Sequence, residues 1–228
     1  MKWREFSSYD ELSAHAARIF IEAIRENPKL VLGLPTGRTP VGMYERVVNE
    51  CSCRDIVTFN LDEYAGISCD HPGSYCAYMQ QHLFSHIDVD ASRTHIPNGI
   101  APDLDAECVR YEQAIANAGG LGLTFLGLGQ NGHIGFNEPG TPFSSRTRVV
   151  ELTHSTRLAN AGLFEGGRVP ERAITIGIAT ILESKRIVLL ASGAAKQDAI
   201  ARLRGGEVSE EFPASALHGH RDVTVLTA

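Results

Sequence analysis

The chain has 228 residues, 43% of them hydrophobic and 21% charged, which is the composition of a globular protein with one large core. Its formal net charge of −6 argues against nucleic acid or an anionic membrane surface as a partner, although a local basic pocket is compatible with it. No apolar run reaches the roughly 18 residues of a membrane span and the N-terminal residues lack a signal-peptide core, so we expect a cytoplasmic protein.

Amphipathic segments alternate with short apolar runs along the chain. The first helix is predicted to begin at Ser8, which forms a capping box with Glu11, and to end near Asn27 and Pro28. The elements that follow, in chain order, are a strand at 29–34, a helix at about 41–50, a strand at 55–61, helices at about 74–86 and 104–117, a strand at 123–128, a candidate strand at 173–178, a strand at 186–192, a helix at about 195–204 and a strand at 222–227.

The strands are nearly continuous apolar runs, which is typical of strands buried on both faces in a parallel sheet. Their alternation with helices predicts an α/β fold: a doubly wound, mostly parallel, Rossmann-like sheet with helices on both faces. No repeat or linker divides the chain, so we predict a single domain over 1–228 with a lid at about 151–172, within which "GLFEGGRVPE" is rich in glycine. Ligands of such sheets bind at the carboxyl ends of the strands.

The five cysteines are an odd number without the spacing of a metal site, and no CxxC pair occurs. This pattern is typical of free, reduced thiols, so we predict no disulfide framework. No other cluster of metal-ligating residues stands out, and no metal ion is predicted. The five are Cys51, Cys53, Cys69, Cys76 and Cys108.

Two strand ends carry polar segments early in the chain. In "LPTGRTP", the residues Thr36, Gly37, Arg38 and Thr39 precede a helix, where free backbone N–H groups and threonine hydroxyls favour an anion. The segment matches neither a Walker A loop nor GxGxxG, and an ordinary strand–turn–helix connection explains it equally well. In "FNLDEYAG", Asp62 is either a general base with a raised pKa or the cap of the next turn.

The segment "GLGQNGHIGFNEPG" (127–140) places His133 and Glu138 among five glycines. A histidine beside a carboxylate is a common acid–base arrangement, although a lone structural histidine is the alternative. In "LLASGAAKQDAI", Lys196 lies in the first turn of a helix, where the helix dipole disfavours a cation. Its position is explained if an anion such as phosphate binds there, and otherwise it is an exposed surface lysine.

Together with "SSRTR" and "FPASALHGH", these segments resemble the glucosamine-6-phosphate deaminase family in its shorter bacterial form, from the first helix to the last strand. The resemblance implies that glucosamine 6-phosphate and water give fructose 6-phosphate and ammonium without a metal or organic cofactor. It implies that Asp62 moves the proton from C2 to C1. It also implies that His133 opens the sugar ring with Glu138 as its partner, and that residues 36–39 and Lys196 bind the phosphate.

Three departures from the family pattern lead to further expectations. Asn131 stands where many members have an aspartate, so His133 should be held less strongly as imidazolium. Arg38 and Gly162 stand where many members have a glycine and a lid arginine, and we hypothesise that Arg38 replaces that arginine. Val150 stands where allosterically regulated members have a basic residue, so no activation by N-acetylglucosamine 6-phosphate is expected.

Other functions remain open from the sequence. The family shares its fold with galactosamine-6-phosphate deaminase/isomerases and with 6-phosphogluconolactonases, and a non-catalytic sugar-phosphate sensor is a further alternative. The "FNLDEYAG" segment disfavours the lactonase, because that reaction needs no base at C2. The expected partner is a small sugar phosphate, and a monomer or small homo-oligomer is expected.

Overall fold

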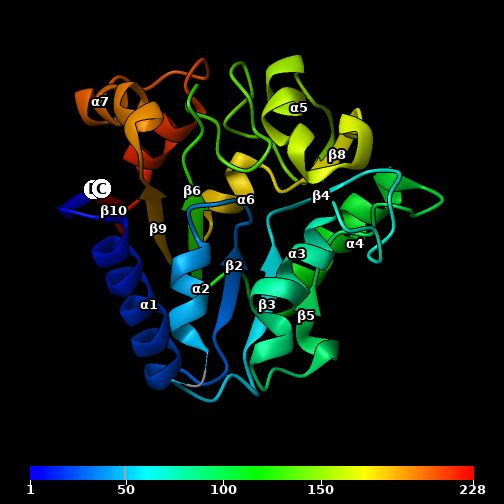
Figure 1. Cartoon of the computed structure of the whole chain (residues 1–228), viewed down its shortest axis with the longest axis horizontal. Helices are drawn as coiled ribbons and strands as arrows, with labels where there is room; N and C mark the ends of the chain where they lie inside the picture. Colours follow the sequence, from blue (N-terminus) through cyan, green and yellow to red (C-terminus); the bar gives the residue numbers. More distant parts are fainter. Residues whose placement is uncertain (49) are drawn as a thin grey trace.

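The computed structural model describes residues 1–48 and 50–228. Seven parallel strands form the main sheet (Figure 1). Their spatial order is β1 (Lys2–Glu5), β10 (Val223–Thr227), β9 (Arg186–Ala191), β6 (Leu123–Gly127), β2 (Val31–Leu34), β3 (Val57–Asn60) and β5 (Thr94–His95). The chain adds β3 and β5 on one side of β2 and then returns to add β6 on the other side, and ligands bind where the strand order reverses in this way.

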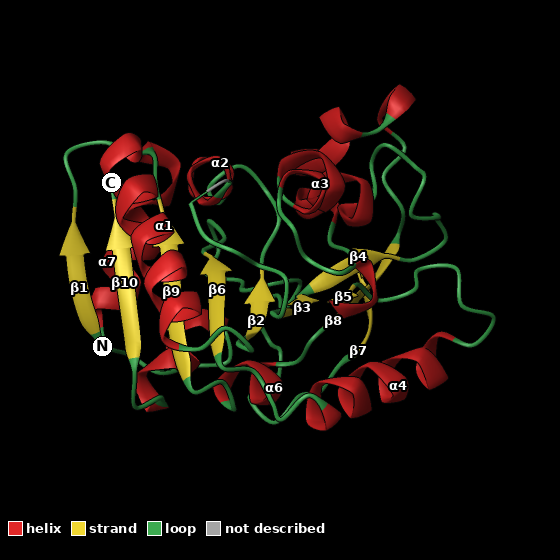
Figure 2. Cartoon of the chain, turned by 90° about the horizontal axis from the view of Figure 1, so that it is seen from below, coloured by secondary structure: helices red, strands yellow, loops and turns green. Residues whose placement is uncertain are grey.

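Helices cover both faces of this sheet (Figure 2). One face carries α1 (Tyr9–Glu26), α2 (Val41–Val47) and α3 (Tyr75–His82), which pack on Leu32 and Leu34 of β2. The other face carries α4 (Leu104–Asn117), α6 (Ile178–Leu182) and α7 (Gln197–Gly205). α4 packs on β3, where the ring of Tyr111 meets that of Phe59, whereas α6 and α7 share a buried cluster with β9 and β10. The predicted doubly wound α/β fold is confirmed.

Most predicted elements are present, with ends that differ by a few residues. The first helix begins after Ser8, whose side chain accepts the N–H of Glu11 as the capping box predicts. The helix predicted at 41–50 ends at Val47, and Asn49 lies outside the described residues. The helix predicted at 74–86 ends at His82 and is followed by a 3₁₀ turn at Phe84–His86.

The prediction of one sheet is incomplete, because a second, antiparallel sheet covers the carboxyl edge of the first. It consists of β4 (Asp62–Tyr64), β8 (Arg172–Thr175) and β7 (Arg148–Glu151), in that order. The candidate strand at 173–178 is therefore not part of the main sheet. Ala173 packs in a small aromatic cluster that includes Tyr64 and Phe164, and Ile174 and Ile176 are also fully buried, which is why the sequence resembles that of a core strand.

The segment predicted as a lid, 151–172, contains more regular structure than its glycines suggest. It holds α5 (His154–Asn160) and two 3₁₀ turns at Ala161–Leu163 and Glu165–Gly167. Phe164 anchors it, because its ring meets Tyr64 edge-on with ring centroids 5.1 Å apart. Whether the segment opens and closes stays a prediction.

The prediction that all cysteines are free is wrong for one pair. Cys69 and Cys76 form a disulfide, because the loop between β4 and α3 turns back and brings their Cα atoms to 5.0 Å. Cys51, Cys53 and Cys108 are free thiols. Nothing in the spacing of Cys69 and Cys76 in the sequence indicated that they pair.

Among residues 1–48 and 50–228, the search for a bilayer-spanning helix finds none with the necessary length and apolar character.

Candidate active site

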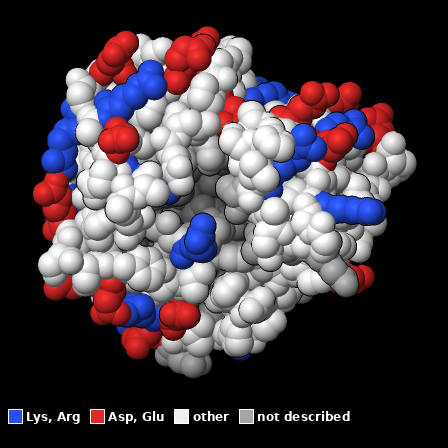
Figure 3. Space-filling view, turned by 45° about the horizontal axis from the view of Figure 1, so that its top comes forward, with Lys and Arg blue, Asp and Glu red and all other residues white. Residues whose placement is uncertain are grey.

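The sequence-predicted residues gather at the carboxyl edge of the main sheet, in the connections that follow β2, β6 and β9 and in β4. Figure 3 brings this edge forward and shows a hollow near the middle of the surface, with a lysine or arginine side chain beside it. The strand order reverses between β2 and β6, and the carboxyl edge at such a reversal is the expected place for a ligand.

Asn131 links His133 to Glu138 within the loop that follows β6. Its amide nitrogen donates to Glu138 Oε2 at 2.7 Å, and its oxygen accepts from His133 Nδ1 at 2.8 Å. The direct distance from His133 Nδ1 to Glu138 Oε2 is 3.6 Å. The neutral imidazole therefore carries its proton on Nδ1, and Nε2 can accept or donate a proton to a ligand.

Glu138 is held as a carboxylate. Burial alone would raise its pKa, but the nearby His133 and hydrogen bonds from Thr156 and Asn131 outweigh burial and lower the pKa to about 2. Thr156 belongs to α5 and donates its hydroxyl to Glu138 Oε1, which ties the predicted lid to this loop.

Two glycines of the loop are required by close packing. A β-carbon at Gly129 would overlap the His133 ring. A β-carbon at Gly135, where φ is +57°, would lie 3.4 Å from Asp62 Oδ2 and 3.0 Å from Thr175 Oγ1. The glycines thus let the loop backbone approach both a histidine and a carboxylate, as a catalytic loop requires.

Asn137 and Arg148 hold this loop in place through hydrogen bonds. Asn137 is fully buried, and its amide nitrogen donates to the carbonyl oxygens of Ile134 and Ile176, both at 2.9 Å. Arg148 of β7 donates to Asn137 Oδ1 at 2.8 Å. The second sheet therefore positions the loop that carries His133.

Asp62 lies in β4 beside that loop, with only 5% of its surface exposed. Its carboxylate accepts no hydrogen bond from any residue that the structure describes. Burial, and to a lesser extent the charge of Glu63, raise its pKa to about 8. A buried carboxyl group with a raised pKa and no partner is well suited to take up and return a proton near neutral pH.

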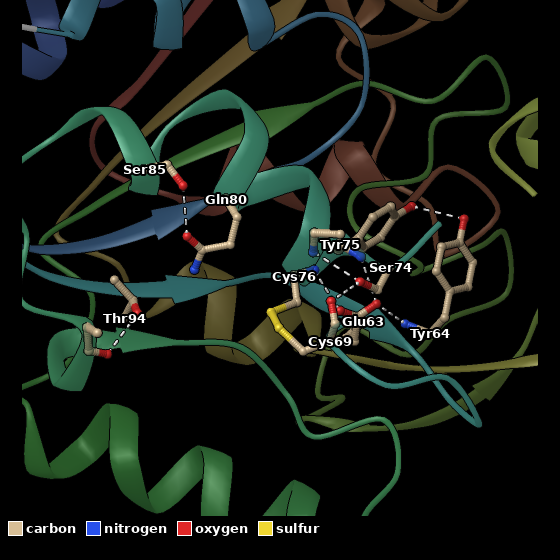
Figure 4. The surroundings of a disulfide bond; sticks show 11 residues. Glu63, Tyr64, Cys69, Ser74, Tyr75, Cys76, Gln80, Ser85 and Thr94 are labelled. Atoms are coloured by element: carbon tan, nitrogen blue, oxygen red, sulfur yellow. Dashed lines mark hydrogen bonds between the residues drawn. A yellow bond between two sulfur atoms is a disulfide. The ribbon is translucent and has the colours of Figure 1, made fainter. Parts of the chain in front are cut away.

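The alternative role of Asp62, capping the next turn, belongs instead to its neighbour Glu63. Glu63 accepts the backbone N–H groups of Tyr75 and Cys76 at the start of α3 (Figure 4). Adjacent side chains of an extended strand point to opposite sides, so Asp62 is left to face the loop of His133.

The segment 36–39 is held by its carbonyl oxygens. Tyr78 donates its hydroxyl to the carbonyl oxygen of Gly37, and Tyr9 donates to those of Arg38 and Thr39. No acceptor for the backbone N–H groups of 36–39 occurs in the described part of the chain. These N–H groups are therefore free to bind a phosphate.

Lys196 and Arg38 lie close enough for their charges to interact. Burial lowers the pKa of Lys196, and the charge of Arg38 lowers it further. Lys196 is half-buried at the start of α7, whereas Arg38 is exposed. Two cations held together without a carboxylate between them are the arrangement expected around a bound dianion.

Tyr75 lies between the two halves of the site. Burial raises the pKa of its hydroxyl well above 10, the charge of Asp62 raises it further, and Thr36 lowers it. The structure therefore brings Asp62, the segment 36–39 and the cation pair to one edge of the sheet. It brings Asn131, His133 and Glu138 to the same edge.

Several contributors were missed by sequence reasoning. They are polar residues that look ordinary in their local sequence, and they hold the site through hydrogen bonds to partners up to 39 residues away along the chain. They are Thr156, Asn137, Arg148 and Glu63. Only the position of Glu63 next to Asp62 offered a signal. Within the described ranges, no group of three or more His, Cys, Asp or Glu side chains could hold a metal ion.

Two further cavities contain none of the predicted residues. One, of about 360 Å³, lies between α4 and the segment Arg146–Thr147. The other, of about 590 Å³, lies between the end of β1 and α7. The chemistry of the chain is concentrated instead at the edge described above.

Known proteins match this chain over nearly its whole length. A family profile described as glucosamine-6-phosphate isomerases/6-phosphogluconolactonase matches residues 5–226. Glucosamine-6-phosphate deaminase of Geobacillus sp. (strain WCH70) is 54% identical over 99% of this chain and 92% of its own length. Glucosamine-6-phosphate deaminase 1 of Bacillus subtilis (strain 168) is 54% identical over 99% of this chain and 96% of its own length.

Solved structures give the same grouping. A structure described as a monomeric glucosamine-6-phosphate deaminase matches with a TM-score of 0.97 and 54% identity, covering 100% of this chain and 97% of that chain. A 6-phosphogluconolactonase from Trypanosoma brucei matches with a TM-score of 0.79 and 20% identity, over 99% of this chain and 95% of that chain. At this lower identity the second likeness concerns the fold alone.

Proposed function

This chain belongs to the family of glucosamine-6-phosphate isomerases and 6-phosphogluconolactonases, and we propose that it converts glucosamine 6-phosphate and water to fructose 6-phosphate and ammonium. Two relatives named for this deamination share 54% of their residues with nearly the whole chain. The observation that carries deamination over lactone hydrolysis is Asp62, a buried carboxyl group without a partner. Hydrolysis of a lactone ester requires no base at a carbon, whereas isomerisation does.

Ring opening is assigned to His133. Its Nε2 takes the proton of the C1 hydroxyl and delivers it to the ring oxygen as the bond between C1 and that oxygen breaks. Asn131 fixes the Nδ1–H tautomer, and the carboxylate of Glu138 stabilises the imidazolium that forms between the two proton transfers. The product is an open-chain aldehyde.

Proton transfer between carbons is assigned to Asp62. The aldehyde makes the C2 proton acidic, and Asp62 removes it while O1 takes a proton from the ammonium group on C2, which leaves a C1–C2 enolamine. Asp62 then returns the proton to C1 while the nitrogen lone pair forms a C2–N double bond. Water adds at C2 and ammonia leaves, taking up a proton to become ammonium, so C2 becomes the ketone of fructose 6-phosphate. One carboxyl group suffices because C1 and C2 are neighbouring atoms and Asp62 reaches both from the same face of the enolamine.

The phosphate of the substrate is assigned to the segment 36–39 with Lys196 and Arg38. These groups lie apart from Asp62, so binding energy from the phosphate can position the reacting carbons without taking part in the chemistry. Arg38 takes the place of the lid arginine that many relatives have at the position of Gly162. We also propose that the protein is a monomer in the cytoplasm, since the solved structure at 54% identity is described as monomeric.

The test is to incubate the purified protein separately with glucosamine 6-phosphate, galactosamine 6-phosphate and 6-phosphogluconolactone, and to measure ammonium and acid release. Ammonium from glucosamine 6-phosphate, abolished by Asp62→Asn, is expected. Release from galactosamine 6-phosphate at a higher kcat/KM would assign the other epimer as substrate. Hydrolysis of the lactone without ammonium release from either amino sugar would overturn the proposal.

A further inference from the structure

Glu63 is a buried carboxylate that the proposed mechanism does not use. Only 3% of its surface is exposed. Its Oε1 accepts the backbone N–H groups of Tyr64 at 2.8 Å and Tyr75 at 2.9 Å, and its Oε2 accepts that of Cys76 at 2.8 Å (Figure 4). Burial raises its pKa to about 7, and the hydrogen bonds from these three N–H groups oppose the rise. Tyr75 and Cys76 begin α3, so their N–H groups have no partner within the helix and carry the positive end of its dipole.

The turn that presents these N–H groups is fixed independently of Glu63. The Cys69–Cys76 disulfide closes it. The hydroxyl of Ser74 donates to the carbonyl oxygen of Cys69 at 3.0 Å and accepts the N–H of Ala77, which caps α3 (Figure 4). Glu63 therefore meets three donors that are already in place, and these donors favour its ionised form.

Asp62 has the opposite surroundings, because no N–H group donates to it in the part of the chain that the structure describes. Its titratable neighbours besides Glu63 are tyrosines, whose hydroxyl pKa values burial raises far above the working range, so they stay neutral. Opposite it on β8 stands the uncharged Thr175, and in the loop after β6 its Oδ2 lies beside Gly135. The tyrosines are Tyr64 of β4, Tyr75 of α3 and Tyr111 of α4.

We propose that Glu63 is a positioning residue for the deamination: its ionised carboxylate, anchored to the start of α3, holds the backbone of β4 and makes Asp62 a stronger base. The inference rests on the proposed function, in which Asp62 must remove a weakly acidic C2 proton and then return it to C1. A base whose pKa lies near the working pH does both well. An isolated aspartate would be too weak a base.

The size of the effect follows from the extended backbone of β4. Adjacent side chains point to opposite sides, so the two carboxylates do not touch, and a separation on the order of 7 Å serves for the estimate. Two charges at this distance, at an effective dielectric constant of about 20, change a pKa by roughly one to two units. Removing the charge of Glu63 should weaken Asp62 as a base by that amount.

The experiment compares the pH dependence of kcat/KM for ammonium release in the wild type and in Glu63→Gln. We expect the acidic limb to move to lower pH by about one unit or more, and kcat to fall several-fold at its plateau while KM changes little. Glu107→Gln is the matched control. Glu107 is also buried and accepts a backbone N–H, from Asn98, but its charge does not act on Asp62. An unmoved limb in Glu63→Gln, or an equal shift in Glu107→Gln, would overturn the inference.

A second measurement needs no variant that might fail to fold. The carboxyl carbons of Asp62 and Glu63 are titrated by NMR in ¹³C-labelled wild-type protein. Glu63 is expected to ionise at the lower pH, and ionisation of Asp62 first would overturn the inference. This reading does not depend on turnover, so wild-type protein that releases no ammonium would refute the proposed function while the ionisation order still tests Glu63.

Discussion

Replacing Asp62 by asparagine should stabilise the protein while removing its activity. The carboxyl group is buried without a partner, and its pKa is about 8 in the folded protein against 3.8 ordinarily. A folded-state pKa raised above the unfolded value means that the folded protein holds the proton longer, so stability falls as pH rises between the two values. At pH 7 the cost is about 4 kcal/mol, from about 1.4 kcal/mol per pH unit over the interval from 3.8 to 7.

The Asp62→Asn variant would escape this cost but would bury an amide whose donors lack partners, at about 1–3 kcal/mol. The net gain at pH 7 is therefore about 1–3 kcal/mol. The pH dependence of the stability difference is more decisive than its size at pH 7, because the cost of burying the amide does not change with pH. The difference in unfolding free energy between variant and wild type should grow by about 1.4 kcal/mol per pH unit from about pH 5 to pH 8.

Urea unfolding of both proteins at several pH values across this interval measures the slope, with ammonium release measured on the same samples. Asp198→Asn is a suitable control, because Asp198 lies exposed on α7 and its replacement should give no slope. A pH-independent difference between Asp62→Asn and wild type would show that Asp62 ionises normally. The reasoning that makes it a poised base would then fail.

Three further predictions concern other parts of the site. Arg38→Gly should raise KM by roughly 10–100-fold, about 1–3 kcal/mol, with kcat little changed; an unchanged KM would show that Lys196 acts without it. Glu138→Gln should lower the unfolding free energy by about 3 kcal/mol at pH 7, since the pKa of Glu138 is about 2 against 4.5 ordinarily. That difference should shrink below about pH 4 in urea unfolding, because a lowered pKa stabilises only the ionised form; a loss that is undiminished at about pH 3 would contradict it. Cys69→Ser should cost about 2–3 kcal/mol, the value for a loop of about eight residues. Dithiothreitol should destabilise the wild type equally in urea and leave the variant unchanged, and an insensitive wild type would mean that Cys69 and Cys76 are already reduced.

The central strands could be predicted because burial on both faces leaves a continuous apolar run. The elements that were missed lack this signal. β1 is an edge strand of sequence KWRE, and β5 has only two residues. β4 and β7 contain charged residues because each lies in a short antiparallel sheet that meets the site. Their pairing depends on residues far apart along the chain, such as Asp62 and Thr175, which local pattern does not reveal.

In the candidate site, too, some residues could be predicted from the sequence and others could not. Sequence reasoning found the residues that contradict their local context: Lys196 at a helix start, and His133 among glycines. It did not find the residues that hold them, because Thr156 and Arg148 fit their own helix and strand without further explanation. Nor could it separate Asp62 from Glu63, since which of two adjacent carboxylates meets the α3 donors is decided only by the fold.

Both halves of the site hold like charges together, and this arrangement is informative about function. Arg38 acts on Lys196 at one end, and Glu63 acts on Asp62 at the other. Neither pair favours the folded protein, so each requires an explanation outside stability. A bound phosphate would neutralise the cation pair, because it supplies the missing negative charge. The carboxylate pair is relieved less completely, because an ammonium group at C2 of the substrate can come near Asp62 but leaves Glu63, on the opposite side of β4, as a second negative charge. The repulsion there persists in the substrate complex, and it is removed only when Asp62 takes up a proton, which is the step that the proposed reaction requires.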